Sequence, residues 1–117
     1  MQKVGILIIT LNRSEFLIRQ LKYYNKVKSI HPIYIGDSSN NYHKNKLLNE
    51  IKSLKDNLNI KYFFLPNYTD REAHFFLAKN CKEKYCTYAG DDDFLIPSSL
   101  TESANFLSNN DEFRTAL

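Results

Sequence analysis

The chain has few residues of the kinds that several protein classes require. Among its 117 residues there are no tryptophans, one methionine and three glycines. The glycines, Gly5, Gly36 and Gly90, are too far apart to form the G-x-G-x-x-G loop of a dinucleotide-dependent oxidoreductase. A nucleotidyltransferase would need a glycine-rich, basic loop after the first apolar run to cradle a triphosphate, and that loop is absent from the sequence. Both enzyme classes are therefore excluded.

Cysteine and histidine are also scarce and scattered. Cys81 and Cys86 do not make a disulfide framework, and we expect both thiols to be free. A structural zinc site would need more ligands at closer spacing than His31, His43 and His74 provide. We therefore expect neither a disulfide-stapled module nor a zinc module.

Long hydrophobic runs are missing as well. The longest, at residues 4–9, is interrupted by Gly5, whereas a membrane-spanning helix needs about 20 apolar residues. The sequence shows no basic segment followed by an apolar stretch and a cleavage site. These features predict a cytoplasmic location and no transmembrane segment.

Charge is unevenly distributed along the chain. Residues 1–84 hold 15 Lys and Arg against 7 Asp and Glu, whereas residues 85–117 hold 1 against 6. A basic body facing an acidic segment suits a ligand that combines phosphates with a metal ion. Nucleic acid is not an expected partner, because the lysines are spread over the sequence and not clustered with aromatic residues.

Apolar residues recur in the pattern of strands that alternate with helices. Continuous apolar runs predict strands at residues 3–10, 32–36, 60–65 and 86–89. Apolar residues at helical spacing predict a helix after each strand, the third at about residues 70–84. Parallel strands need crossover connections. Four such units therefore predict one α/β domain over residues 1–117, with a mostly parallel sheet and helices on both faces.

Two of the predicted helices have residues suited to a capped N-terminus. Asn12 precedes the first helix with Glu15 three residues later, and Ser99 and Glu102 have the same spacing before the fourth. In a capping box, each side chain of such a pair accepts a hydrogen bond from a backbone N–H at the helix start. We therefore expect Asn12 and Ser99 to cap these helices.

The most informative feature is the acid triplet Asp91, Asp92 and Asp93, which follows the fourth predicted strand and Gly90. Folding does not require three adjacent like charges. A divalent cation such as Mg²⁺ or Mn²⁺ would relieve their repulsion and could share its coordination with phosphate oxygens. Ligands of parallel sheets bind outside the carboxyl ends of the strands. The alternative is a solvated acidic turn before the next helix.

Four segments carry motifs in a recognisable order. They are ILIITLNR (residues 6–13), IYIGDSS (33–39), FFLAKN (75–80) and YAGDDDFLIP (88–97). Together they resemble the nucleotide-sugar-binding half of family 2 glycosyltransferases, which have the Rossmann-like GT-A fold. The first segment is similar to the family's opening strand and T-Y-N-R turn, and the second to its second strand with an acidic end. The third is similar to the A-x-A-R-N helix, and the last to the metal-binding D-x-D segment.

The resemblance implies that the chain binds a nucleotide-diphosphate sugar, with a UDP-sugar favoured. The residues that it assigns to this ligand are Thr10, Leu11, Asn12, Arg13, Asp37, Lys79 and Asp91. Leu11 replaces an aromatic residue of the family, and Lys79 replaces an arginine at the phosphates. Asp37 would accept a hydrogen bond from the base or the ribose, although the family's acid usually falls one position earlier, at Gly36.

The resemblance also implies Mn²⁺ or Mg²⁺ as a cofactor. If Pro97 fixes the register of the D-x-D segment, Asp92 is the principal metal ligand and Asp93 its neighbour, with Asp91 turned towards the ribose. An alternative register uses Asp91 and Asp93. In either register a metal would stabilise charge on the leaving diphosphate as a Lewis acid.

The family's general base and its acceptor site lie well beyond the D-x-D segment, so no catalytic residue is assigned here. We expect the sheet to be truncated relative to the family, and sugar transfer by this chain alone to be weak or absent. The implied acceptor is a glycan or a lipid-linked molecule of polysaccharide biosynthesis, with peripheral contact at the inner membrane face. An unpaired sheet edge would permit self-association. The alternative function is a non-catalytic remnant that acts as a binding or assembly module.

Overall fold

Eight elements alternate along the chain in the computed structural model, which describes residues 2–110, 112 and 113. They are β1 (Val4–Thr10), α1 (Ser14–Lys26), β2 (Ile33–Asp37), α2 (Asn41–Leu54), β3 (Ile60–Phe64), α3 (Asp70–Asn80), β4 (Tyr85–Ala89) and α4 (Pro97–Asn109). The predicted alternation of strands and helices is confirmed. The third helix ends at Asn80, earlier than the sequence predicted.

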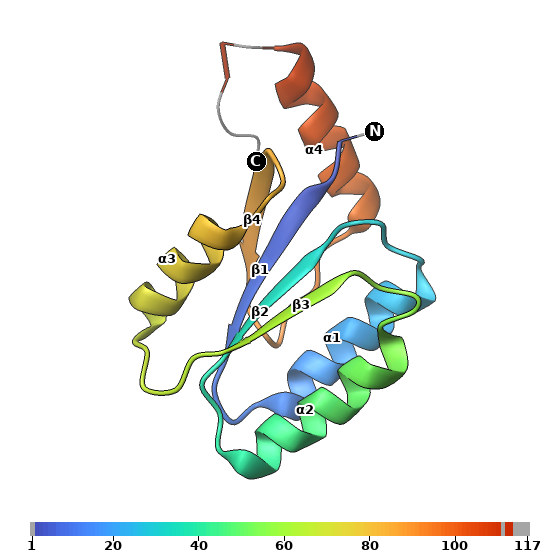
Figure 1. The fold of residues 1–117 in the computed structure, drawn as a ribbon. Coiled ribbons are helices and arrows are strands. Elements are labelled where there is room, and N and C mark those ends of the chain that lie inside the picture. The colour runs from blue at the N-terminus through green and yellow to red at the C-terminus, as the bar shows by residue number, and fades with distance from the viewer. Residues whose placement is uncertain (1, 111, 114–117) are drawn as a thin grey trace.

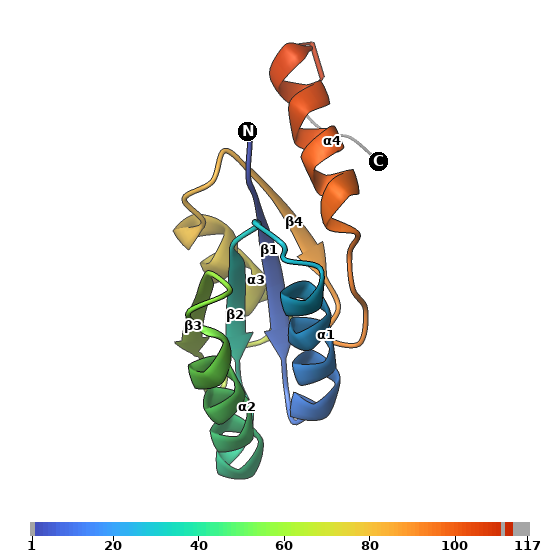
Figure 2. The same ribbon diagram turned by 90° about the vertical axis from the view of Figure 1, so that its right-hand side faces the viewer.

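The four strands form one parallel sheet in the order β3-β2-β1-β4. Helices α1 and α2 lie against one face and α3 against the other (Figure 1). Helix α4 lies on the same side as α1, towards the end of the sheet where the strands begin (Figure 2). The predicted α/β fold, with a parallel sheet and helices on both faces, is confirmed.

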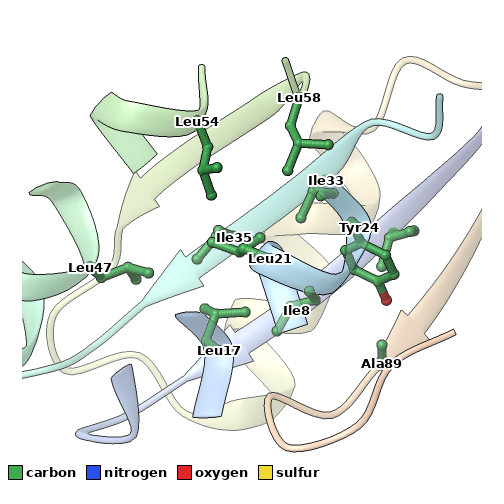
Figure 3. Packing of buried hydrophobic residues seen from close by; sticks show 11 residues of the cluster. Ile8, Leu17, Leu21, Tyr24, Ile33, Ile35, Leu47, Leu54, Leu58 and Ala89 are labelled. Atoms are coloured by element: carbon green, nitrogen blue, oxygen red, sulfur yellow. The ribbon is translucent and has the colours of Figure 1, made fainter. Parts of the chain in front are cut away.

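Alternating side chains of the central strand build a core on each face. Ile6 and Ile8 of β1 face the larger cluster, which α1 and α2 complete with residues such as Leu17 and Leu21 (Figure 3). Leu7 faces the opposite side and belongs to the smaller cluster against α3. Burial on both faces explains why β1 is apolar at almost every position. This packing fixes β1, so the loop that follows β1 starts from a rigid strand.

Two predicted helix caps are wrong. Arg13, and not Asn12, takes the N-cap position of α1, and no side chain caps this helix. Asn12 instead has a positive φ of 55° and bonds with a neighbouring loop. Helix α4 starts two residues before Ser99, because Pro97 occupies its first turn, where proline's fixed φ is favourable and its missing N–H is not needed.

The capping box that the structure does contain belongs to α3. The Thr69 hydroxyl accepts a hydrogen bond from the Glu72 N–H at 3.1 Å, and the Glu72 carboxylate accepts one from the Thr69 N–H at 2.9 Å. These bonds satisfy donors at the start of a helix that opens at the carboxyl end of the sheet. No helix within the described residues has both the length and the apolar character that a membrane span requires.

Candidate functional site

An open cavity of about 600 Å³ lies at the carboxyl ends of β1 and β4, beside the first turns of α3. Its wall includes Thr10, Leu11, Arg13, Ser38, Thr69, Asp70, His74, Tyr88, Asp91 and Asp92. The volume falls in the range of about 300–1,000 Å³ that is usual for small-molecule sites. The position is the one at which parallel sheets bind ligands.

Arg13 connects two carboxylates of the acid triplet at this cavity. Its Nε lies 3.1 Å from Asp91 Oδ1, and its Nη2 lies 3.1 Å from Asp92 Oδ2. The Thr10 hydroxyl donates a 2.9 Å hydrogen bond to the second oxygen of Asp91. Asp91 is therefore buried and bound through both oxygens, whereas the Asp92 side chain is 53% exposed. The structure thus brings together four of the predicted residues.

Hydrogen bonds with side chains of α1 hold the loop that carries these acids, residues 90–95. Gln20 Nε2 donates to the Gly90 carbonyl at 2.9 Å, and its Oε1 accepts from the Tyr24 hydroxyl at 2.7 Å. That hydroxyl accepts from the Leu95 N–H at 3.0 Å, and its burial raises the pKa of Tyr24 to about 12. Gln20 and Tyr24 therefore fix both ends of the acid loop.

Sequence reasoning missed Gln20 and Tyr24 as residues that shape the site. The Tyr24 ring belongs to the buried apolar stripe of α1 and packs in the larger core cluster. Gln20 lies one turn before Tyr24 and one residue before Leu21, and it is as buried as its apolar neighbours. A glutamine within the buried stripe of a helix is a detectable signal, because a buried amide must find hydrogen-bond partners.

Asn12 connects two strand-end loops and does not form part of the cavity wall. Its backbone N–H donates to Ser39 Oγ at 2.8 Å, and its side-chain oxygen accepts from the Asn40 N–H at 2.8 Å. Asparagine tolerates the left-handed φ of this position better than most residues do. The contacts fix the backbone from which the neighbouring Arg13 side chain extends.

Asp37 lies outside the cavity wall and is fully buried. Its Oδ1 accepts from the Ser39 N–H at 2.9 Å, and its Oδ2 accepts from the Tyr62 hydroxyl at 2.7 Å. Burial and the bond to Asp37 raise the pKa of Tyr62 above its ordinary value. Both carboxylate oxygens of Asp37, which the resemblance assigned to the nucleotide, thus accept hydrogen bonds within the protein.

Lys79 is not brought to the cavity. It is exposed in the last turn of α3, whereas the cavity is lined by Thr69, Asp70 and His74 at the opposite end of the helix. Lys79 lies nine positions after Asp70 in the helix, which is roughly 13 Å along the axis. The third helix therefore contributes its first turns to the site, and the other end carries the lysine.

The acid loop can provide oxygen ligands to a metal ion. A Cβ placed on Gly90 would lie 2.9 Å from Asp93 Oδ2 and 3.2 Å from Asp92 Oδ1, so both oxygens face one small space beside this glycine. Carboxylate oxygens are the donors that Mg²⁺ and Mn²⁺ prefer. The donor set fits, although no group of three or more His, Cys, Asp or Glu within the described part of the chain is arranged around a common point for a metal.

Comparison with known proteins identifies similar structures but no sequence family. No family model and no curated protein matches the chain. The crystal structure of residues 1–349 of TarS from S. aureus is similar with a TM-score of 0.73 and 17% identity. The match covers 92% of this chain and 33% of that one.

Two further TarS structures give the same result. The crystal structure of S. aureus TarS has a TM-score of 0.71 at 19% identity, with 92% of this chain and 20% of that one covered. The complex of TarS 1–349 with UDP has a TM-score of 0.71 at 18% identity, with 92% and 32% covered. The chain thus spans a third or less of these structures. At such identities the likeness concerns the fold alone: the chain has the α/β fold of the matched part of these structures.

Proposed function

We propose that this chain is the donor-binding part of a metal-dependent glycosyltransferase and that its cavity binds a nucleotide-diphosphate sugar, with a UDP-sugar as the first candidate. The observation that carries the proposal is that Arg13 binds both Asp91 and Asp92 at the carboxyl edge of a GT-A-like sheet, beside an open cavity. A similar structure was solved in complex with UDP, which supports this choice of nucleotide.

In this proposal the acid loop holds the metal and the loop after β1 holds the nucleotide. Asp92 and Asp93 would ligate Mn²⁺ or Mg²⁺ with the oxygens that face Gly90. A bound metal supplies Lewis-acid stabilisation of the charge on the leaving diphosphate. Thr10 and Arg13 orient Asp91, and the exposed Leu11 side chain offers an apolar wall to the nucleoside. The alternative ligand pair, Asp91 and Asp93, is less favoured because Asp91 is already bound through both oxygens.

The acceptor side belongs to the same proposal and rests on the family resemblance. A glycan or lipid-linked acceptor of polysaccharide biosynthesis would meet the donor at this edge of the sheet, in the cytoplasm or at the inner membrane face. No general base is assigned to any residue of the chain, so transfer by this chain alone is expected to be weak. Strand β4 is an edge strand of the sheet, through which we further propose self-association.

A non-catalytic binding or assembly module is the second candidate. It is favoured by the burial of Asp37 and by the position of Lys79 at the far end of α3, because two residues expected to contact the donor do not line the cavity. The two candidates differ in one measurable property. A donor-binding domain binds nucleotide in a metal-dependent way, and a remnant does not.

Calorimetric titration with UDP, with and without Mn²⁺, tests this difference. We expect binding that requires Mn²⁺, and Asp92→Asn is expected to weaken it by roughly tenfold or more, which is about 1.4 kcal/mol. Asp70→Asn is the matched control, because it removes the same charge from the wall of the same cavity outside the acid loop. Metal-dependent binding that survives in Asp92→Asn would refute the metal role of Asp92, and absence of binding in the folded wild type would favour the second candidate.

A further inference from the structure

The positive charge of Arg13 lies between the carboxylates of Asp91 and Asp92. Its guanidinium uses Nε for Asp91 and Nη2 for Asp92, at 3.1 Å each. Two adjacent acids that share one planar, permanently charged group have their repulsion largely offset. The acid loop therefore has a positive partner of its own, supplied by the loop after β1.

The two ion pairs of Arg13 are not equally fixed. Asp91 is 11% exposed at its side chain and also accepts a hydrogen bond from Thr10, whereas the Asp92 side chain is 53% exposed. The Arg13 side chain is itself 45% exposed. Exposed ion pairs contribute only about 0.2–1 kcal/mol. Of the two contacts, the one with Asp92 is therefore the easier to exchange.

The Arg13 backbone is held in place while its side chain can turn. The preceding residue, Asn12, is bonded to Ser39 and Asn40, and the Arg13 carbonyl accepts from Phe16 at the start of α1. The guanidinium also lies 4.6 Å from the centre of the Phe16 ring, a cation–π contact that does not depend on the carboxylates. A fixed backbone and a half-exposed guanidinium suit a side chain that changes partners within one cavity.

We propose that Arg13 is an internal counter-ion of the acid loop. It holds Asp92 in the absence of metal, yields Asp92 to a divalent cation, and then pairs with a phosphate of the bound nucleotide. This inference rests on the proposed function and adds to it a coupling between the two ligands. A cation at Asp92 Oδ1 repels the guanidinium that pairs with Oδ2 of the same carboxylate, and this competition makes metal alone bind weakly. Nucleotide gives the displaced guanidinium a new bidentate partner, so metal and nucleotide bind more tightly together than separately.

Mn²⁺ binding, followed by the electron paramagnetic resonance signal of the free ion, tests this coupling without an activity assay. In Arg13→Gln we expect Mn²⁺ alone to bind roughly five- to tenfold more tightly than in the wild type, because one or two ion pairs no longer compete. We also expect UDP to increase Mn²⁺ affinity less in the variant than in the wild type.

Arg19→Gln is the matched control, because Arg19 also lies over the Phe16 ring, at 5.6 Å from its centre. It removes an equal charge from the same helix region, and we expect its Mn²⁺ affinity to stay at the wild-type value. Thermal unfolding followed by circular dichroism checks that each variant folds. If Arg13→Gln does not fold, Arg13→Lys replaces it, with a smaller increase expected because one ammonium group cannot fork between two acids.

The outcomes separate this inference from the proposed function. If the wild type shows Mn²⁺-dependent UDP binding but the Arg13 variant binds Mn²⁺ no more tightly, the counter-ion role is overturned and the donor site stands. Equal tightening in the Arg19 control would also overturn it, since loss of any nearby charge would then suffice. If neither protein binds Mn²⁺ or UDP while folded, both the inference and the proposed function are overturned.

Discussion

At the residue scale, the Tyr24 hydroxyl connects helix α1 to the loop that carries the acids. It donates to Gln20, which holds the start of the loop, and accepts from the Leu95 N–H at its end. Tyr24 and Gln20 are both almost completely buried, so water cannot replace these bonds. The geometry of the acids at the cavity therefore depends on two residues that do not line it.

Tyr24→Phe removes this hydroxyl and keeps the ring. It leaves a buried amide oxygen and a backbone N–H without their partner, and we expect a loss of about 1–3 kcal/mol in the free energy of unfolding. Urea unfolding measures this loss, and amide exchange of Leu95 should speed up as the loop loosens. Tyr23→Phe is the control, because the Tyr23 ring packs against Phe94 of the same loop, and within the described residues its hydroxyl makes no hydrogen bond. Equal stability of the two variants would contradict the role of Tyr24.

At the element scale, the strands and the start of α3 at Asp70 could be predicted, whereas the caps of α1 and α4 could not. Each observed strand begins and ends within one residue of its predicted bounds. Strands β1 and β2 are buried at almost every position, which explains their continuous apolar runs. The edge strands β3 and β4 are only partly buried, yet their apolar runs still indicated their positions. Helix starts depend on competing partners for one side chain. The spacing predicted that Asn12 caps α1, but Asn12 forms hydrogen bonds with Ser39 and Asn40 instead. Pro97 sets the start of α4 two residues before the expected Ser99.

The same contrast applies to the candidate site. The order of the strands places the ends of β1 and β4 at one edge of the sheet, and the structure brings Thr10, Arg13 and Asp91 together there. Motif spacing did not indicate that the side chain of Asp37 turns inward to Tyr62. It also did not indicate which end of α3 lies at the cavity, and Lys79 lies at the other one. Side-chain direction and helix polarity require the three-dimensional packing.

Helix α3 begins at the cavity, and Thr69 of its capping box lies in the cavity wall. Thr69→Ala removes the hydroxyl that accepts from the Glu72 N–H, and we expect a loss of roughly 1 kcal/mol in the free energy of unfolding. Thr69→Ser keeps a hydroxyl at the same position and should lose much less. Chemical denaturation of the three proteins measures the difference. A serine variant as unstable as the alanine variant would show that the threonine methyl group matters more than the cap.

At the scale of the whole molecule, His31 connects the first strand to the last helix. Its Nδ1 accepts from the Val4 N–H at 3.0 Å, so Nε2 carries the proton and faces the Pro97 carbonyl and the Thr101 hydroxyl, each at 3.0 Å. Only the neutral imidazole can accept and donate in this way. The position of α4, and of the acid loop that leads into it, thus depends on one buried histidine.

Burial lowers the pKa of His31 below its ordinary value; the Pro97 carbonyl opposes this shift, and the charge of Lys3 adds to it. The unfolded chain then binds the proton more readily than the folded one. The stability that His31 contributes is therefore complete above about pH 6.5 and decreases as the pH falls below that value. Melting temperatures of the wild type should decrease between pH 7.5 and pH 5.5, and those of His31→Gln should decrease less over the same range. His74→Gln, which replaces a histidine of the cavity wall on α3, is the control and should keep the wild-type slope. A slope that is unchanged in His31→Gln would mean that another group causes the loss of stability.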